Sequence, residues 1–418
     1  MDRTLSPKFV IADQLDLIFP ERIELKNGCV LYWMKDVKDE AVKLDIDWEA
    51  GTKYQDQKLI SSFTNKLLLS GSEELSSKQI DEEMDFYGGF YQMQLDKDHA
   101  GITLYGLTEN MNDIFSVFSK AFSVANFPQN ELDKERTIAI EKFKIEQQKV
   151  KVICRQLFTP NLFGADTAYG QVAELSDFDA LNSDELRRFF NTHYKTAPTL
   201  FLTGNVNKDF IEVLRDWSAN FQTPIKTNLI QEFTQTNGRV HHEKVDAIQT
   251  AIRIGRLMFD KKHPDYFGFQ LLNTIYGGYF GSRLMANIRE DKGYTYGIGS
   301  GMAVMQDAGY FFIATEVGKD VKDDAVKEIF NEMNKLKEAP VSEEELTKVK
   351  NYMLGEFLRQ ADGPMALIEV FKNIYYNKLP KSYYADFIQA IHDATPQSLQ
   401  DLANKYFVEE EMLVVTAG

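Results

Sequence analysis

The stretch Gly277–Met302 reads GGYFGSRLMANIREDKGYTYGIGSGM. Arg289 falls near the end of an expected helix, and Gly293 permits the turn that follows it. Beyond the turn, alternating residues and a central turn predict a β-hairpin over residues 294–315. The stretch therefore predicts a helix, a tight turn and a hairpin, with Tyr296 at the beginning of the first strand.

The elements around this stretch occur twice, at a spacing of roughly 210 residues. Val42–Trp48 alternates as a half-buried strand does, and Ile248–Ile254 alternates likewise. Four further pairs follow in the same order: Leu59–Gly71 with Tyr266–Gly278, Asp98–Gly101 with Gln306–Gly309, Glu131–Phe143 with Glu345–Phe357, and the helix and strand ending at Gly204 with those ending at Gly418. Matched pairs in one order predict two homologous domains.

The arrangement of these elements indicates the fold class. Strands and helices are mixed within each half, without the regular βαβ alternation of a Rossmann sheet, which predicts an α+β fold. The polar stretch 222–238 has few periodic apolar positions and separates the halves. The expected domains are therefore residues 1–221 and 239–418, joined by a linker over 222–238.

Composition and charge exclude several classes of function. The chain has 418 residues, 44% of them hydrophobic, and a formal net charge of −16, so it would repel nucleic acid and anionic membrane surfaces. Its two cysteines, Cys29 and Cys154, form no CxxC motif and fit a reducing compartment. No apolar run has the length of a signal peptide or of a membrane span. A cytoplasmic protein is expected, although a removed signal segment would leave the same sequence.

The stretch Gly277–Met302 is similar to the second-domain signature of the insulinase/pitrilysin-like zinc peptidases, which include the mitochondrial processing peptidases. Weaker similarities to the same family lie at Ala50–Tyr54, at Leu162–Gly164 with Tyr169-Gly170, and at Thr203–Val206. The resemblance implies paired homologous domains, each a mostly antiparallel sheet packed with helices. It further implies that subunits of this size pair around a chamber that admits unfolded peptides.

The resemblance also locates the place where active family members bind zinc. They carry H-x-x-E-H on the first helix of the first domain, with two histidine ligands and a glutamate that serves as general base. The two ligand positions hold Ser62 and Lys66, and the base position holds Asn65. A further glutamate ligand comes from a downstream helix, where the register places Lys142, or Glu141 after a slip of one residue. Serine is a poor zinc ligand and an ammonium repels the cation, so the resemblance implies a degenerate site without zinc.

A zinc site built from other residues is disfavoured. The six histidines include no pair at the i, i+4 spacing that shares a helix face. His241, His242 and Glu243 form a cluster, but adjacent residues of a strand point to opposite sides of the sheet. Polar residues near the beginning of a strand explain this cluster more simply.

Two residues of the second domain match positions that the family uses to hold substrate. The family presents an arginine and a tyrosine seven residues apart toward the zinc, and the matching residues are Arg289 and Tyr296. A guanidinium and a phenol can donate hydrogen bonds to a peptide carbonyl and to the oxyanion that develops on it. A surface ion pair of Arg289 and sheet packing of Tyr296 are the simpler alternatives. Tyr294 would face the other side of the strand, and Gly277 and Gly278 are secondary candidates in a helix-ending turn where glycine tolerates positive φ.

Three functions are compatible with these residues. In the leading hypothesis, the chain is a zinc-free subunit that pairs with a catalytic subunit of the same family, binds extended peptides and supplies Arg289 and Tyr296 to the partner's zinc site. In the second, it is a non-enzymatic peptide-binding or scaffold homodimer, similar to core subunits of respiratory complexes that share this fold. In the third, it is a peptidase with an unrecognised site, although G-x-S-x-G is absent and Cys29 is typical of a packing residue.

Overall fold

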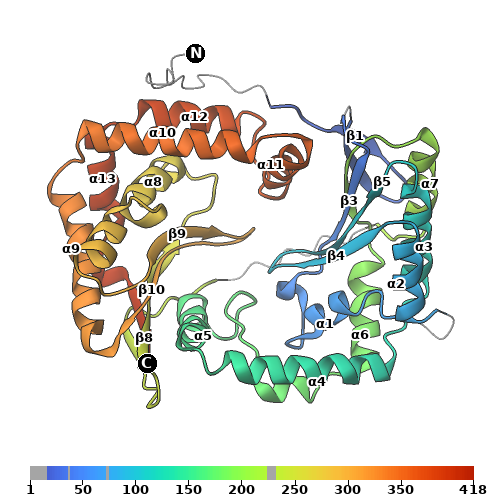
Figure 1. Cartoon of the computed structure of the whole chain (residues 1–418), viewed down its shortest axis with the longest axis horizontal. Helices are drawn as coiled ribbons and strands as arrows, with labels where there is room; N and C mark the ends of the chain where they lie inside the picture. The colour runs from blue at the N-terminus through green and yellow to red at the C-terminus, as the bar shows by residue number, and fades with distance from the viewer. Residues whose placement is uncertain (1–16, 36–37, 72–74, 224–231) are drawn as a thin grey trace, which may run out of the picture. The chain divides into compact units, whose positions relative to one another are not determined.

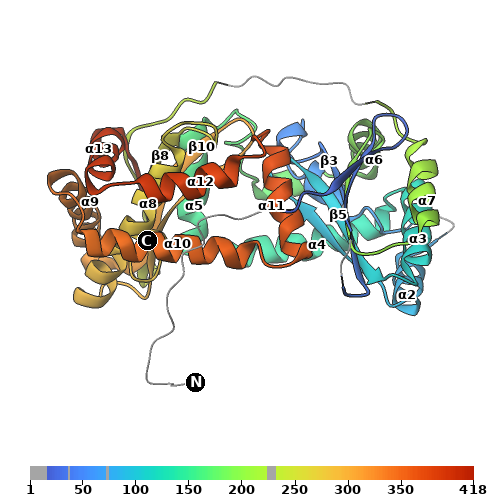
Figure 2. The same ribbon diagram turned by 90° about the horizontal axis from the view of Figure 1, so that it is seen from above.

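The computed structural model describes residues 17–35, 38–71, 75–223 and 232–418, so residues 224–231 of the expected linker lie outside the described part. The chain divides into two compact units. The first comprises Phe19–Thr236, and the second comprises Asn237–Gly418 together with the described residues before Phe19. Figures 1 and 2 show that each unit consists of a twisted sheet packed against helices.

The first unit is built on a six-stranded sheet with the strand order β1-β2-β6-β3-β5-β4. Strands β2 and β6 are parallel, and the other neighbouring pairs are antiparallel. The strands are β1 Glu21–Glu24, β2 Val30–Met34, β3 Ala41–Trp48, β4 Phe90–Leu95, β5 Ala100–Leu107 and β6 Thr199–Thr203. The helices are α1 Ile60–Lys66, α2 Ser77–Phe86, α3 Met111–Ser123, α4 Gln129–Glu146, α5 Val150–Phe163, α6 Ser183–Phe189 and α7 Lys208–Ser218, with short helical turns at Thr52–Tyr54, Leu175–Phe178 and Phe190–Tyr194.

The second unit has a five-stranded sheet with the order β7-β11-β8-β10-β9, in which only β7 and β11 are parallel. Its strands are β7 Gly238–His242, β8 Gln249–Met258, β9 Ile298–Val304, β10 Gly309–Gly318 and β11 Leu413–Ala417. Its helices are α8 Tyr266–Asn273, α9 Lys322–Glu338, α10 Glu343–Gln360, α11 Pro364–Tyr376, α12 Tyr383–Asp393 and α13 Pro396–Tyr406. Two π-helical segments, η4 Thr274–Gly278 and η5 Met285–Asp291, follow α8, and 3-10 turns lie at Lys319–Val321 and Glu409–Glu411. Throughout the described part of the chain, no helix is both long and apolar enough to span a bilayer.

Both units have the same topology, which confirms the expected α+β fold with two homologous domains. The strand order β6-β3-β5-β4 of the first sheet corresponds to β11-β8-β10-β9 of the second, and in each sheet one parallel strand, β2 or β7, lies beside this set. Helices α4 and α10 each have 18 residues and carry the matched segments of the two halves. One strand begins later than predicted, because Ile248 precedes β8 and is 89% exposed.

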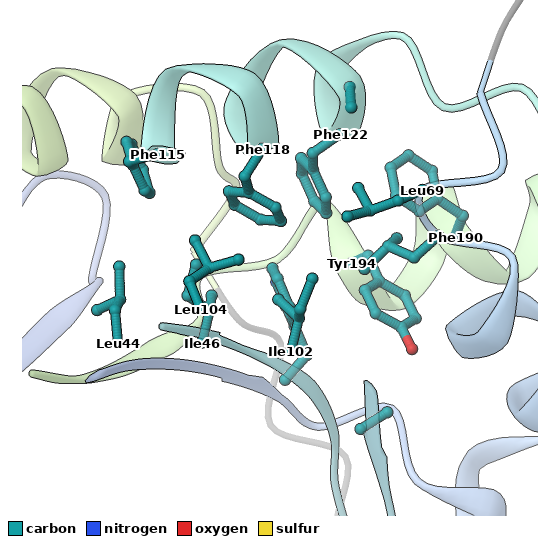
Figure 3. Packing of buried hydrophobic residues seen from close by; sticks show 14 of the residues in the cluster. Leu44, Ile46, Leu69, Ile102, Leu104, Phe115, Phe118, Phe122, Phe190 and Tyr194 are labelled. Atoms are coloured by element: carbon teal, nitrogen blue, oxygen red, sulfur yellow. The ribbon is translucent and has the colours of Figure 1, made fainter. Parts of the chain in front are cut away.

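The core of the first unit lies between the sheet and α3. Figure 3 shows the phenylalanine side chains of α3 directed at the apolar face of β3 and β5. Phe115, Phe118 and Phe122 share one face of α3 because they are three and four residues apart, and all three are buried. They cover four buried side chains of the two strands: Leu44, Ile46, Ile102 and Leu104. This packing fixes α3 on β3. The end of β3 is followed by the loop that leads into α1.

Strand β3 differs from the expected half-buried strand, because both of its faces are buried. Its polar face holds Lys43, Asp45 and Asp47, and each of these residues is less exposed than a tenth. Lys43 Nζ lies 3.1 Å from Asp45 Oδ2, and Thr103 on β5 donates a hydrogen bond of 2.6 Å to Asp45 Oδ1. Charges that pair inside a protein have the same alternating pattern in the sequence as solvated charges, so the alternation indicated the strand but not its second buried face.

The loop between β3 and α1 is anchored by a buried ion pair. Lys53 Nζ lies 2.9 Å from Asp98 Oδ1, and the two side chains are 6% and 8% exposed. Tyr169 donates a hydrogen bond of 2.6 Å to the same carboxylate oxygen. The backbone N–H groups of Thr52 and Lys53 donate to the carbonyl oxygens of residues 96 and 97 at 3.1 and 2.8 Å. Since this loop leads directly into α1, these contacts help to position α1.

We expect the first unit to lose stability as the pH falls below the ordinary histidine pKa. Burial lowers the pKa of His99 and of His193 below the usual 6.5, although nearby aspartates oppose this at His99. The unfolded chain therefore binds protons that the folded unit binds poorly, so stability that is present above pH 6.5 decreases as the pH falls toward the folded pKa values. Urea unfolding should show a lower midpoint at about pH 5.5 than at about pH 7.5. The difference should shrink in His99→Gln, and an undiminished difference would contradict the role of His99.

Candidate functional site

The residues expected at the first zinc-ligand position and at the general-base position, Ser62 and Asn65, lie on α1 and form contacts within the protein. Ser62 is half-buried, and its hydroxyl donates a hydrogen bond of 2.9 Å to the carbonyl oxygen of Leu59. Asn65 is 2% exposed. Its Nδ2 donates to the carbonyl oxygen of Gln94 at 2.8 Å, and its Oδ1 accepts from the Tyr194 hydroxyl at 2.9 Å. Both side chains therefore stabilise the local fold.

Lys66, at the expected second ligand position, forms an ion pair with Glu135 of α4. The resemblance places the further glutamate ligand at position 142, or at position 141 after a slip of one residue. Lys142 and Glu141 are both exposed, and Glu141 pairs with Lys144 at 2.8 Å. The α4 carboxylate that contacts α1 is thus Glu135, which lies two helical turns before Lys142 on the same face of α4. The family spacing predicted position 142, and the helical repeat places Glu135 on the same face of α4, but the sequence does not show which of the two residues contacts α1.

These residues do not fit a bound zinc ion. Zinc sites in proteins use cysteine, histidine and carboxylate ligands, usually three or four of them. Helix α1 offers a hydroxyl, an amide and an ammonium, and the ammonium of Lys66 neutralises the carboxylate of Glu135. Across the described ranges, no group of three or more His, Cys, Asp or Glu side chains could hold a metal ion. A cationic side chain, Lys66, therefore lies at the position where the resemblance places the second metal ligand.

The His241–Glu243 cluster connects two strands. His241 Nδ1 lies 2.8 Å from Thr416 Oγ1 on β11, and His241 Nε2 lies 3.2 Å from Glu243 Oε2. His242, the next residue, is exposed. These contacts tie the edge strand β7 to β11.

Arg289 lies in the last turn of η5, where its guanidinium rests on an aromatic ring. The guanidinium carbon is 4.7 Å from the centre of the Phe280 ring, and Phe280 is itself 67% exposed. Nη1 lies 3.7 Å from Glu290 Oε1, and the Arg289 side chain is 34% exposed. The surface ion pair considered as an alternative is therefore present, but an exposed pair at this distance contributes little free energy. Part of the guanidinium remains accessible to a ligand.

Tyr296 is 94% exposed and lies between η5 and β9. The prediction that Tyr296 begins the strand is wrong, because β9 begins at Ile298. The segment is fixed by the neighbouring residue, since Thr295 donates a hydrogen bond of 2.8 Å to the carbonyl oxygen of Glu316 on β10. Gly293 has a φ of +67° and allows the turn after η5. Because Thr295 is held against β10, the adjacent Tyr296 side chain projects into solvent.

Gly277 and Gly278 belong to η4, and neither has a positive φ, contrary to expectation. A Cβ atom on Gly277 would lie 2.5 Å from Ser300 Oγ and 2.8 Å from Leu284 Cδ1. A side chain at position 277 would therefore displace Ser300 or Leu284, so glycine allows η4 to approach β9 closely. Gly278 is exposed, whereas Tyr294 is half-buried and packs against the core of the second unit.

Two family models match successive parts of the chain. Residues 32–168 match the model described as Insulinase (Peptidase family M16), and residues 180–353 match the model described as Peptidase M16 inactive domain. The chain belongs to the insulinase-like peptidase family M16. The first matched segment contains α1 and the second contains Arg289 and Tyr296.

Individual relatives are similar to this M16 chain over most of their length. An uncharacterized zinc protease of Bacillus subtilis, YmxG, is 22% identical over 342 residues, which are 81% of this chain and 83% of that protein. The crystal structure of a peptidase M16 inactive domain from Pseudomonas fluorescens has a TM-score of 0.87 at 20% identity and covers 96% of this chain and 98% of its own. Subunit 1 of the mouse mitochondrial cytochrome b-c1 complex is 18% identical over 388 residues, 87% of this chain and 78% of that protein. The structural similarity confirms the M16 fold.

Proposed function

We propose that this M16 chain is a zinc-free partner subunit of a catalytic M16 metallopeptidase. It binds extended peptides and supplies Arg289 and Tyr296 to the zinc site of the partner, which carries the H-x-x-E-H ligands and the general base. The two subunits form a heterodimer. We expect it in the cytoplasm, because Cys29 and Cys154 are both buried and form no disulfide.

The main observation that supports this proposal is the ion pair between Lys66 and Glu135. A zinc ion at α1 would have to separate Glu135 from Lys66 and would then face an ammonium group. Two unit positive charges 4 Å apart repel by about 4 kcal/mol at an effective dielectric constant of 20, and a divalent ion is repelled more strongly. Asn65 cannot take a proton from water at neutral pH, so the general base is missing as well.

The accessible donors of the second unit support the substrate-binding role. Arg289 presents a guanidinium supported by the Phe280 ring, and Tyr296 presents an exposed phenol. A guanidinium offers several N–H donors and a phenol offers one O–H donor, which suits the carbonyl groups of an extended peptide. Such donors stabilise the negative charge that develops on a carbonyl oxygen during hydrolysis.

The isolated chain is expected to contain no stoichiometric zinc and to leave an unstructured peptide intact. Elemental analysis by mass spectrometry and a fluorogenic peptide assay measure both properties. When the chain is mixed with an H-x-x-E-H subunit from the same genome, chelator-sensitive hydrolysis should exceed that of the catalytic subunit alone. One zinc ion per isolated chain, or chelator-sensitive cleavage by the chain on its own, would contradict this proposal.

The similarity to subunit 1 of the cytochrome b-c1 complex favours a second candidate, a non-enzymatic peptide-binding or scaffold homodimer. Light scattering after size-exclusion chromatography distinguishes the two candidates. The partner-subunit proposal predicts that the chain exchanges into a heterodimer with the catalytic subunit. A homodimer that persists in the presence of that subunit and leaves its activity unchanged would favour the scaffold.

A further inference from the structure

The second unit contains a pocket of about 690 Å³ between α8, α10, α11 and α12, which we call the α8–α12 pocket. Figure 1 shows α10 and α12 side by side near α8, with α11 at the end of α10. A pocket of this size accommodates a small molecule or the end of a peptide. Arg289 and Tyr296 are not among the residues that line it, so it is separate from the residues proposed to hold substrate.

One side of the α8–α12 pocket is formed by aromatic rings. Phe267 of α8 lies 4.8 Å from Tyr383 and 5.6 Å from Phe387 of α12, measured between ring centres. Phe357 of α10 lies 5.6 Å from Phe387 and stacks on Tyr384 at 4.8 Å. These contacts hold the rings as a continuous apolar surface. Such a surface binds the apolar body of a ligand by removing both from water.

The polar end of the pocket is organised by the amide of Asn373 on α11. Lys261 donates a hydrogen bond to Asn373 Oδ1, and Asn373 Nδ2 donates a bond of 2.7 Å to the Tyr384 hydroxyl. An ammonium can only donate, which fixes Oδ1 toward Lys261 and Nδ2 toward Tyr384. The Tyr384 oxygen therefore accepts from Asn373 and keeps its own hydrogen for another acceptor. One amide thus holds an ammonium and a hydroxyl donor at the same end of the pocket.

The charge of Lys261 is not balanced by a carboxylate. Among the residues that the structure describes, Lys261 forms no ion pair, and burial lowers the pKa of its ammonium from the ordinary value. A bound anion would relieve this cost because it would supply the missing opposite charge. Of the two glutamates that line the pocket, Glu356 is paired with Arg359 at 2.7 Å and Glu369 is exposed.

We propose that the α8–α12 pocket binds a ligand that carries one carboxylate on an aromatic or branched apolar body. Lys261 and Tyr384 hold the carboxylate, and the rings of Phe267, Phe357 and Phe387 hold the body. A phosphate is a poorer fit, because one ammonium faces it without an arginine and two glutamates lie nearby. The carboxylate belongs either to a free small acid or to the C-terminus of a peptide.

Isothermal titration calorimetry with N-acetyl-L-phenylalanine tests the proposal, and N-acetyl-L-phenylalaninamide is the matched uncharged control. The acid is expected to bind at least about tenfold more tightly than the amide, because the amide loses a charge-assisted hydrogen bond. A hexapeptide ending in phenylalanine, as free acid and as amide, distinguishes the two sources. Binding of the small acid alone indicates a free ligand, and binding of the peptide acid as well indicates a chain end.

Three variants test the residues. Lys261→Met keeps the aliphatic stem and should weaken binding about tenfold or more, whereas Lys262→Met, at an exposed neighbouring position, should leave it unchanged. Tyr384→Phe should weaken binding several-fold, and Ala366→Phe should abolish it by filling the pocket. Thermal unfolding of each variant checks the fold. The absence of saturable binding at millimolar acid, or equal affinity of Lys261→Met and wild type, would overturn the proposal.

Discussion

Replacing Arg289 by alanine is expected to lower kcat/KM of the proposed heterodimer by roughly 10²–10³-fold. The guanidinium would donate to the carbonyl oxygen as negative charge develops on it, so the loss should appear mainly in kcat. Phe280 supports the guanidinium at 4.7 Å, so Phe280→Leu should lower kcat/KM less than Arg289→Ala does. The measurement is steady-state hydrolysis of an unstructured peptide by the purified heterodimer.

A matched charge control is available beside Arg289. Lys292 is exposed, and Lys292→Ala removes the same charge from the same segment without touching the guanidinium. Arg289→Lys should restore only part of the activity, because an ammonium keeps the charge but loses the planar fork of donors. If Arg289→Ala forms the heterodimer normally and retains full kcat/KM, Arg289 does not act on the substrate. Arg289 would then be an ordinary surface residue.

The duplicated fold was predictable because it depends on local patterns. The alternation around Val42–Trp48 follows from which face of the sheet a residue presents, and the matched segments Glu131–Phe143 and Glu345–Phe357 both form long helices, α4 and α10. Two copies of these segments in the same order predicted that both domains have the same topology. The two sheets share the corresponding strand order. Contacts between segments that are far apart in the chain leave no periodic pattern in the sequence, so they could not be predicted. The polar face of β3 is buried because Thr103 and Lys43 satisfy Asp45, and neither partner could be inferred from the alternation.

The candidate site was predictable in its residue types but not in its contacts. The residue types Ser62 and Lys66 at the expected ligand positions could be read from the sequence, whereas the contact of Glu135 with Lys66 depends on how α4 packs beside α1. Tyr296 was expected in a strand because its neighbours alternate, but the alternation begins before the sheet hydrogen bonds do. The α8–α12 pocket had no signal in the sequence, since residues from four helices converge on it.

The largest loss of stability is expected when Lys53 is replaced by methionine, at about 3–5 kcal/mol of the free energy of unfolding of the first unit. The substitution leaves the carboxylate of Asp98 buried at 8% exposure without this cation. Urea unfolding followed by circular dichroism measures the loss. The control is Lys78→Met, because Lys78 pairs with Glu82 at 3.5 Å on the surface and its side chain is 82% exposed. That variant should lose at most about 1 kcal/mol.

A second substitution separates the cost of burying a charge from the value of the pair. In Lys53→Met combined with Asp98→Leu, the carboxylate at position 98 is removed together with its cation, so the double variant should be more stable than Lys53→Met alone. It should still be less stable than wild type, because the Tyr169 hydroxyl loses its 2.6 Å acceptor, at about 1–3 kcal/mol. If Lys53→Met instead behaves like Lys78→Met, the ion pair does not anchor the loop. The position of α1, and with it the Lys66–Glu135 contact, would then depend on the remaining hydrogen bonds of the loop and on the packing of α1 itself.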